Sequence, residues 1–115
     1  MLNNERLNAN RTRTLLPGEN QVEFDLFSGY FENLANPTND FEALLTDDVV
    51  TSAWDVRRID HVKRMISIPM EAEEFAALER AKRKLYAQNW RALQQVRGRT
   101  KGIKAPELPE NRRLM

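Results

Sequence analysis

Basic side chains recur along one stretch of the chain at spacings suited to binding phosphate groups. Four of them, Arg80, Arg83, Lys84 and Arg91, lie away from the apolar face of the predicted last helix. Arg80, Arg83 and Lys84 are nearer Pro69, where fewer acidic residues are available to neutralise them. Rows of Lys and Arg bind the nucleic-acid backbone and give affinity without base specificity. The N-terminal segment, which is also basic, adds two arginines. We therefore predict a nucleic-acid surface of six residues: Arg80, Arg83, Lys84, Arg91, Arg11 and Arg13.

A second candidate surface alternates aromatic, apolar and basic residues. Its members recur every three or four residues: Val50, Trp54, Arg57, His61, Arg64 and Ile68. Such a surface can stack bases and pair with phosphates, so Trp54, Arg57 and His61 are predicted to contact a partner. The alternative is that Val50 and Trp54 pack against a preceding helix while the basic ends reach solvent. The sequence leaves both interpretations open.

Residues for catalysis or metal binding are scarce. The chain has no cysteine and one histidine, which excludes a disulfide scaffold, a thiolate zinc site and a thiol nucleophile. There is no glycine-rich phosphate loop and no Gly-x-Ser-x-Gly motif. Asp47 and Asp48 are adjacent, so on a helix they diverge by about 100° and do not share a ligand. We predict neither an enzyme, nor a metal site, nor a cofactor.

Charge is segregated along the 115 residues, although the whole chain has a formal charge of only +1. Residues 17–60 hold ten acidic side chains against Arg57 and Arg58, and residues 61–104 hold eleven basic ones against four acidic. In an antiparallel hairpin the basic end of the last helix lies beside the acidic start of the one before. Four carboxylates could then neutralise Arg91 and Arg97, which would mask part of the basic surface: Asp40, Glu42, Asp47 and Asp48.

The elements that position these residues are all predicted to be helices. Asn20 and Asn39 are predicted to cap the first and second helices, because each has a Glu three positions later. Asn36-Pro37 is predicted to end the first helix. The second helix is predicted to reach Ile68, and Pro69 separates it from the third. The predicted fold is all-α: a long antiparallel hairpin with a shorter N-terminal helix packed near its open end. It consists of a basic extended arm at 1–19, a three-helix domain at 20–98 and a tail at 99–115.

Apolar residues at helical spacing predict one buried face per helix. The first is expected to bury Phe24, Phe27, Phe31 and Leu34. The second is expected to bury Phe41, Leu45, Val49, Ser52, Val56, Ile59 and Ile66. The third is expected to bury Phe75, Leu78, Leu85, Tyr86, Leu93 and Val96.

Short motifs along most of the chain form a pattern. They are Asn8-Ala9, Leu16-Pro17-Gly18-Glu19, Glu23-Phe24, Trp54-Asp55-Val56-Arg57-Arg58 and Trp90-Arg91-Ala92-Leu93. The pattern resembles a widespread family of short uncharacterised bacterial proteins with Asn-Ala…Leu-Pro-Gly-Glu…Glu-Phe…Trp-x-x-Arg-Arg, although that family's His-Gly-Leu element is missing here. The resemblance implies a helical fold and no particular activity. The basic arm also resembles the leading segments of some phage small-terminase proteins.

These observations favour a non-catalytic accessory subunit of a bacterial or phage nucleoprotein assembly. The rival hypothesis is a protein–protein adaptor or self-associating helical module without a nucleic-acid role, in which acidic and basic faces meet. No apolar run is long enough for a membrane span and no signal-peptide core is seen, so we expect a cytoplasmic protein.

Overall fold

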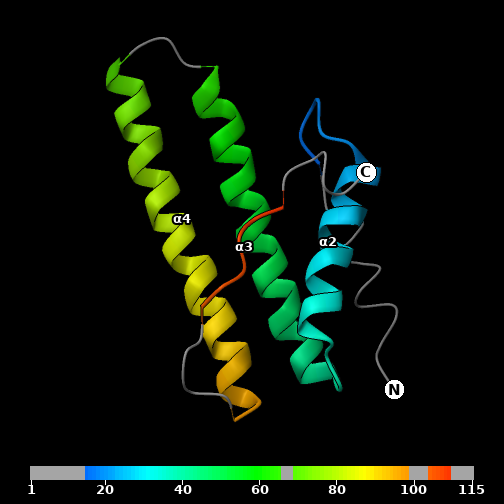
Figure 1. The fold of residues 1–115 in the computed structure, drawn as a ribbon. Coiled ribbons are helices and arrows are strands. Elements are labelled where there is room, and N and C mark those ends of the chain that lie inside the picture. Colours follow the sequence, from blue (N-terminus) through cyan, green and yellow to red (C-terminus); the bar gives the residue numbers. More distant parts are fainter. Residues whose placement is uncertain (1–14, 66–68, 99–103, 110–115) are drawn as a thin grey trace.

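Three helices form the body of the protein in a computed structural model that describes residues 15–65, 69–98 and 104–109. They are α2 (Gln21–Ala35), α3 (Asp40–Arg64) and α4 (Pro69–Val96). α3 and α4 form a long antiparallel hairpin, and α2 packs against α3 at the end away from Pro69 (Figure 1). The described ranges contain no strand. The all-α hairpin with a shorter helix before it is therefore confirmed.

The helix starts follow the capping residues. The side-chain oxygen of Asn20 accepts hydrogen bonds from the backbone amides of Val22 (2.7 Å) and Glu23 (3.3 Å). Asn39 accepts one from the amide of Glu42 at 2.8 Å. These bonds satisfy amides that have no partner within their own helix. Both predicted N-terminal caps are confirmed.

The helix ends differ in how well the sequence predicts them. Asn36 adopts a left-handed conformation (φ 44°) and ends α2 where expected. α3 ends at Arg64 rather than at Ile68, with Met65 as its C-cap, and residues 66–68 lie outside the described ranges. Pro69 blocks a helix but does not require the preceding one to reach it, so the predicted length was too great.

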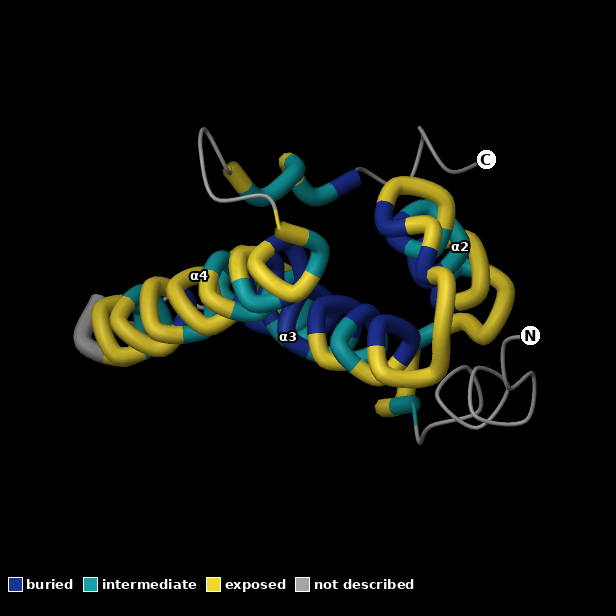
Figure 2. The backbone as a smooth tube through the Cα atoms, turned by 90° about the horizontal axis from the view of Figure 1, so that it is seen from below, coloured by how far each residue is buried: buried dark blue, intermediate teal, exposed yellow. Residues whose placement is uncertain are grey.

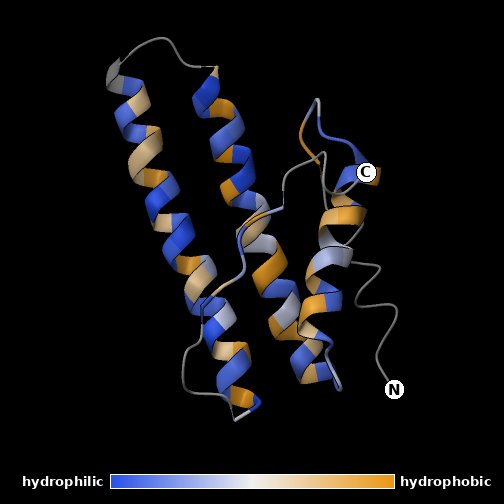
Figure 3. Cartoon of the chain, viewed as in Figure 1, coloured by the Kyte–Doolittle hydropathy of each residue, from blue (hydrophilic) through white to orange (hydrophobic). Residues whose placement is uncertain are grey.

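The core lies where α2, α3 and α4 meet. The Trp54 ring packs edge-on against Phe24 and Phe27, with both centroid separations 5.0 Å. Phe31 reaches across to Tyr86 of α4 at 5.8 Å, which ties the third helix into the same cluster. The cluster members are Phe24, Phe27, Phe31, Ala35, Val49, Val50, Ala53, Trp54, Tyr86, Trp90 and Leu93. Hydrophobic segments run along α2 and the half of α3 beside it, and hydrophilic and hydrophobic bands alternate along α4 (Figure 3).

Several residues predicted to be buried are exposed, so the predicted faces were too wide. Leu34 is 47% exposed and Phe41 57%. On α4, Tyr86 and Leu93 are buried, whereas Leu78, Leu85 and Val96 are between 41% and 48% exposed. The apolar residues of α4 therefore form two stripes, and the described residues cover one of them. Ile66 lies outside the described residues.

A short C-terminal segment, residues 104–109, packs on the helices; we call it the strap. It crosses between α4 and α2 on one side of the helix layer (Figures 1 and 2). The Tyr30 hydroxyl donates to the carbonyl of Glu107 at 3.4 Å, and the Tyr86 hydroxyl donates to the carbonyl of Pro106. Leu108 is partly buried against the core. The strap lacks helix, as predicted for the tail, but it extends the packed domain beyond residue 98.

Candidate nucleic-acid interface

Three of the predicted phosphate-binding residues form an exposed row on the outer side of α4. We call Arg80, Lys84 and Arg91 the basic ridge; all three are exposed. The positions three and four residues before and after each of them hold only Ala, Gln, Arg or Lys. Since neighbours on a helix surface lie three or four residues apart, the ridge has no carboxylate beside it on its own helix. None of the three makes an ion pair within the described part of the chain.

Arg83 lies next to the ridge in sequence but belongs to a different contact. Its Nη2 is 3.6 Å from the Oε1 of Glu79, and Glu79 accepts a 2.9 Å bond from Lys63 of α3. Burial raises the pKa of Glu79, but the hydrogen bond from Lys63 and the charges of Lys63 and Arg83 outweigh it and hold the pKa below its usual value. Arg83 remains 53% exposed on its side chain, with part of its charge balanced.

The masking considered from the sequence occurs at Arg97. Its Nε donates to the Oε1 of Glu42 at 3.0 Å, and its Nη2 donates to the carbonyl of Asn36. Glu42 was one of the four carboxylates expected to act in this way. Arg91, the other arginine expected to be neutralised, stays exposed without an ion pair among the described residues. The acidic start of α3 therefore leaves the ridge uncovered.

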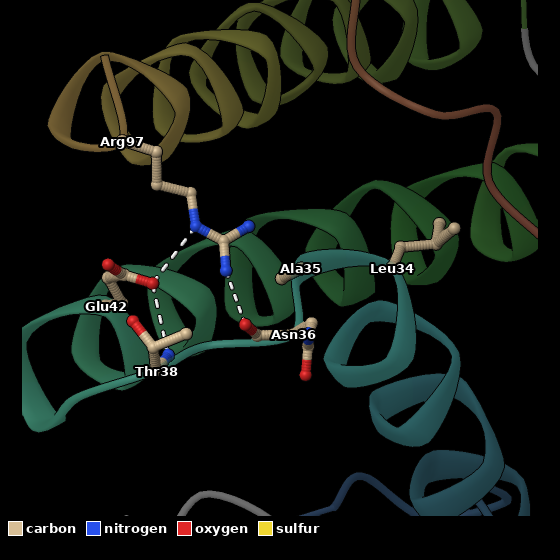
Figure 4. A pocket seen from close by; sticks show the side chains of 6 residues that line it. All are labelled: Leu34, Ala35, Asn36, Thr38, Glu42 and Arg97. Atoms are coloured by element: carbon tan, nitrogen blue, oxygen red, sulfur yellow. Dashed lines mark hydrogen bonds and ion pairs between the residues drawn. The ribbon is translucent and has the colours of Figure 1, made fainter. Parts of the chain in front are cut away.

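The residues around Arg97 also line an open pocket of about 530 Å³ between α4 and the connection from α2 to α3 (Figure 4). The backbone amide of Thr38 donates to Glu42 at 3.1 Å. This bond lowers the pKa of Glu42; burial opposes the shift and Arg97 adds to it. The ion pair between Arg97 and Glu42 holds the connection from α2 to α3 against the end of α4. Because Arg97 is already paired, the residues that line this pocket offer no free cation to an anionic ligand.

The second predicted surface is divided between core and solvent. Trp54 is 2% exposed and packs on α2, the alternative that the sequence left open. The Arg57 guanidinium lies 4.8 Å from the Trp54 ring centroid, and its Nη2 is 3.1 Å from Glu23. His61, one turn further on, is exposed. In this fold Trp54 has no face free to stack a base, and Arg57 covers its ring.

One ion pair that sequence reasoning missed fixes the turn before α2. Arg58 donates from Nε and Nη2 to the two carboxylate oxygens of Glu19, both at 2.8 Å. Such a two-bond contact has a defined geometry, and it raises the pKa of Arg58. The Leu-Pro-Gly-Glu turn followed by a later Arg-Arg pair was the available signal. Arg11 and Arg13, the predicted arm contacts, lie outside the described residues.

No group of three His, Asp or Glu side chains in the described ranges is placed to hold a metal ion. Among the described helices, none is long and apolar enough to cross a membrane. Compared with known protein families, curated proteins and solved structures, the chain has no match.

Proposed function

We propose that this protein is a non-catalytic accessory subunit of a nucleoprotein assembly and that its basic ridge binds the phosphate backbone. The observation that supports this most strongly is the state of Arg80, Lys84 and Arg91. They are exposed on one helix face with no carboxylate three or four residues away, while other arginines of the described core are held in ion pairs. An unpaired row of cations attracts a polyanion.

The spacing of the ridge suits several contacts to one backbone. At 1.5 Å per residue, Arg80 and Lys84 are about 6 Å apart along the axis, and Arg80 and Arg91 about 16 Å. Gln88 and Gln95 are exposed on the same side of α4, and Gln side chains also donate to phosphate oxygens. No aromatic side chain accompanies the ridge, so we expect binding that depends little on base sequence.

The rival function is a helical adaptor that binds protein only. One observation supports this rival: large apolar side chains are exposed on the α3–α4 hairpin, where a protein partner could cover them. The two functions use different faces of α4, so variants of one face test each of them separately.

The ridge is tested by a charge reversal with a matched control. The ridge variant is Arg80→Glu with Lys84→Glu. The control is Arg64→Glu with Lys104→Glu, which makes the same change in net charge at exposed positions outside the ridge. Binding to labelled duplex DNA and to structured RNA is measured by fluorescence anisotropy at low salt, with helical content checked by circular dichroism.

We expect the ridge variant to weaken binding at least tenfold and the control to change it by less than about threefold. Equal losses in both variants would mean that only overall charge matters, which would overturn the assignment to the ridge. Unchanged binding in the ridge variant would overturn it as well.

A further inference from the structure

One side of the α3–α4 hairpin exposes six large hydrophobic residues. We call it the apolar face; its members are between 39% and 57% exposed: Phe41, Leu44, Val62, Leu78, Leu85 and Val96. Several large apolar side chains exposed together on one side of a domain mark an interaction site.

Hydrogen bonds across the hairpin show that the two helices contribute to the same face. Within α3, Asp48 and Asp55 continue the three- and four-residue spacing that begins at Phe41 and Leu44. The Asn89 amide donates to the carbonyl of Asp48 at 3.1 Å. Lys82 Nζ is 3.7 Å from Asp55.

On α4, Lys82 and Asn89 alternate with Leu78, Leu85 and Val96 at spacings of three, four and seven residues. The stripes of α3 and α4 therefore lie side by side, and the polar residues Asp48, Asp55, Lys82 and Asn89 are interleaved with the apolar ones. This arrangement is a surface shared by both helices, not a set of scattered residues.

The opposite side of the hairpin is already covered. Trp54 and Val50 of α3 are buried in the cluster with α2, and Tyr86 of α4 lies beneath the strap. Figure 2 shows the strap on one side of the helices and exposed residues along α3 and α4 on the other. Apart from the turn before α2, whose Glu19 contacts Arg58 of α3, the described residues leave the six residues of the apolar face exposed.

We infer that the apolar face binds the same face of a second copy of this chain, forming a four-helix bundle from two hairpins. A two-helix surface of about 37 Å by 20 Å presents on the order of 700 Å², from the rise and diameter of a helix. Stable interfaces bury roughly 800 Å² per partner. An isologous dimer requires a self-complementary patch, and antiparallel bundles provide the packing geometry.

The charges select one orientation of the two copies. If α3 of one copy lies on α4 of the other, Asp55 faces Lys82 of the second copy and Asp48 faces Asn89 of the second copy. If α3 instead lies antiparallel on α3, Asp48 faces Asp55 of the second copy, twice by symmetry. Like charges facing each other across an interface are unfavourable. The first orientation also places Leu44 beside Val96 of the second copy, so apolar ends meet.

This dimer leaves the basic ridge accessible. Around α4, Arg80, Lys84 and Arg91 lie more than 90° from Leu78, Leu85 and Val96 at 100° per residue. The inference therefore does not depend on nucleic-acid binding. Each dimer would carry two ridges.

The test measures molecular mass in solution at protein concentrations from about 1 to 100 μM. Light scattering on eluted wild-type protein should give twice 13.4 kDa at the upper concentrations. Leu78→Glu with Leu85→Glu should give 13.4 kDa throughout, with an unchanged helical spectrum. Val22→Glu with Leu34→Glu, which changes two similarly exposed apolar residues on α2, should remain dimeric.

A wild-type monomer at 100 μM would overturn the inference, and residues of the same chain would then be the occupant to seek. A dimer that survives Leu78→Glu with Leu85→Glu would overturn the assignment of the face. Arg80→Glu with Lys84→Glu should keep the dimer, so failure of the proposed function and failure of this inference give different results.

Because the chain has no cysteine, single cysteines report the orientation. Chains with Leu44→Cys mixed with chains with Val96→Cys should form the mixed disulfide under mild oxidation. A mixture of Leu44→Cys chains with Val62→Cys chains should give at least tenfold less mixed disulfide. The reverse preference would contradict the proposed orientation.

Discussion

Trp54 and Arg80 show how differently two residues predicted to make external contacts are used. Trp54 lies between two phenylalanines with 2% of its surface exposed, and Arg57 covers its ring. Arg80 has no ion pair among the described residues and faces solvent. A large aromatic residue at helical spacing could belong to either environment, because periodicity does not tell which helix covers the face.

Trp54→Ala should therefore act on stability. Removing a buried aromatic ring costs about 3–5 kcal/mol through lost contacts and the cavity left behind. Urea unfolding followed by circular dichroism measures the change. The control is Phe41→Ala, which changes an exposed aromatic residue. Its loss of unfolding free energy should be much smaller when it is measured at a concentration where the protein is monomeric. A loss below 1 kcal/mol in Trp54→Ala would contradict the packing described for this residue.

Glu42 predicts how stability depends on pH. Its pKa is lowered in the folded protein by the Thr38 amide and by Arg97. The carboxylate therefore stabilises the fold fully above the ordinary glutamate pKa of about 4.3, and this contribution is lost as the pH falls through the lower folded value. Glu42→Gln should lower the melting temperature at pH 7 and lower it less at pH 3.

The matched control for Glu42 is Glu73→Gln, which changes an exposed carboxyl group on α4. Thermal melts of both variants and the wild type across pH 3–7 make the comparison. A difference between wild type and Glu42→Gln that is constant over this range would rule out a titration of Glu42 as its source.

At the scale of elements, local sequence signals predicted where helices begin better than they predicted which helix faces are buried. Asn20 and Asn39 cap their helices because a cap depends on neighbours within three residues. Leu78 and Leu85 were expected in the core, yet are exposed, because an apolar stripe does not reveal whether its partner is in the same chain. The strap was missed as a packed element since nothing local in residues 104–109 indicates what covers them.

Tyr86 holds the strap against α4, so Tyr86→Phe should loosen it. The variant keeps the buried ring and removes the hydroxyl that donates to the carbonyl of Pro106. A lost hydrogen bond of this kind costs about 1 kcal/mol. Hydrogen exchange of the strap amides and denaturant unfolding report the two effects.

Tyr30→Phe is the comparison for the strap, because the Tyr30 bond to Glu107 is longer, at 3.4 Å, and exposed. Its effect should be smaller than that of Tyr86→Phe. If neither variant, nor Leu108→Ala, changes stability or strap exchange, the strap contributes nothing to the fold and its described packing is wrong.

For the whole molecule, charge and apolar surface are separated. Ion pairs such as Arg97 with Glu42 and Lys63 with Glu79 join α3 to α4. They neutralise part of the charge that is segregated along the sequence into an acidic and a basic half. The three cations of the ridge have no ion pair within the described residues. Arg80, Lys84 and Arg91 could be selected from sequence because no acidic residue lies three or four positions away. Glu79 lies four residues before Arg83, so the same spacing also predicts the pairing of Arg83.

The measurement that tests the central claim most directly is the salt dependence of nucleic-acid binding by the wild-type protein. Three phosphate contacts per chain on duplex DNA predict that log K falls with log salt concentration at a slope of about −2.7. Arg80→Glu with Lys84→Glu should reduce that slope by about 2. Folded protein that binds neither duplex DNA nor structured RNA at low salt would contradict the claim.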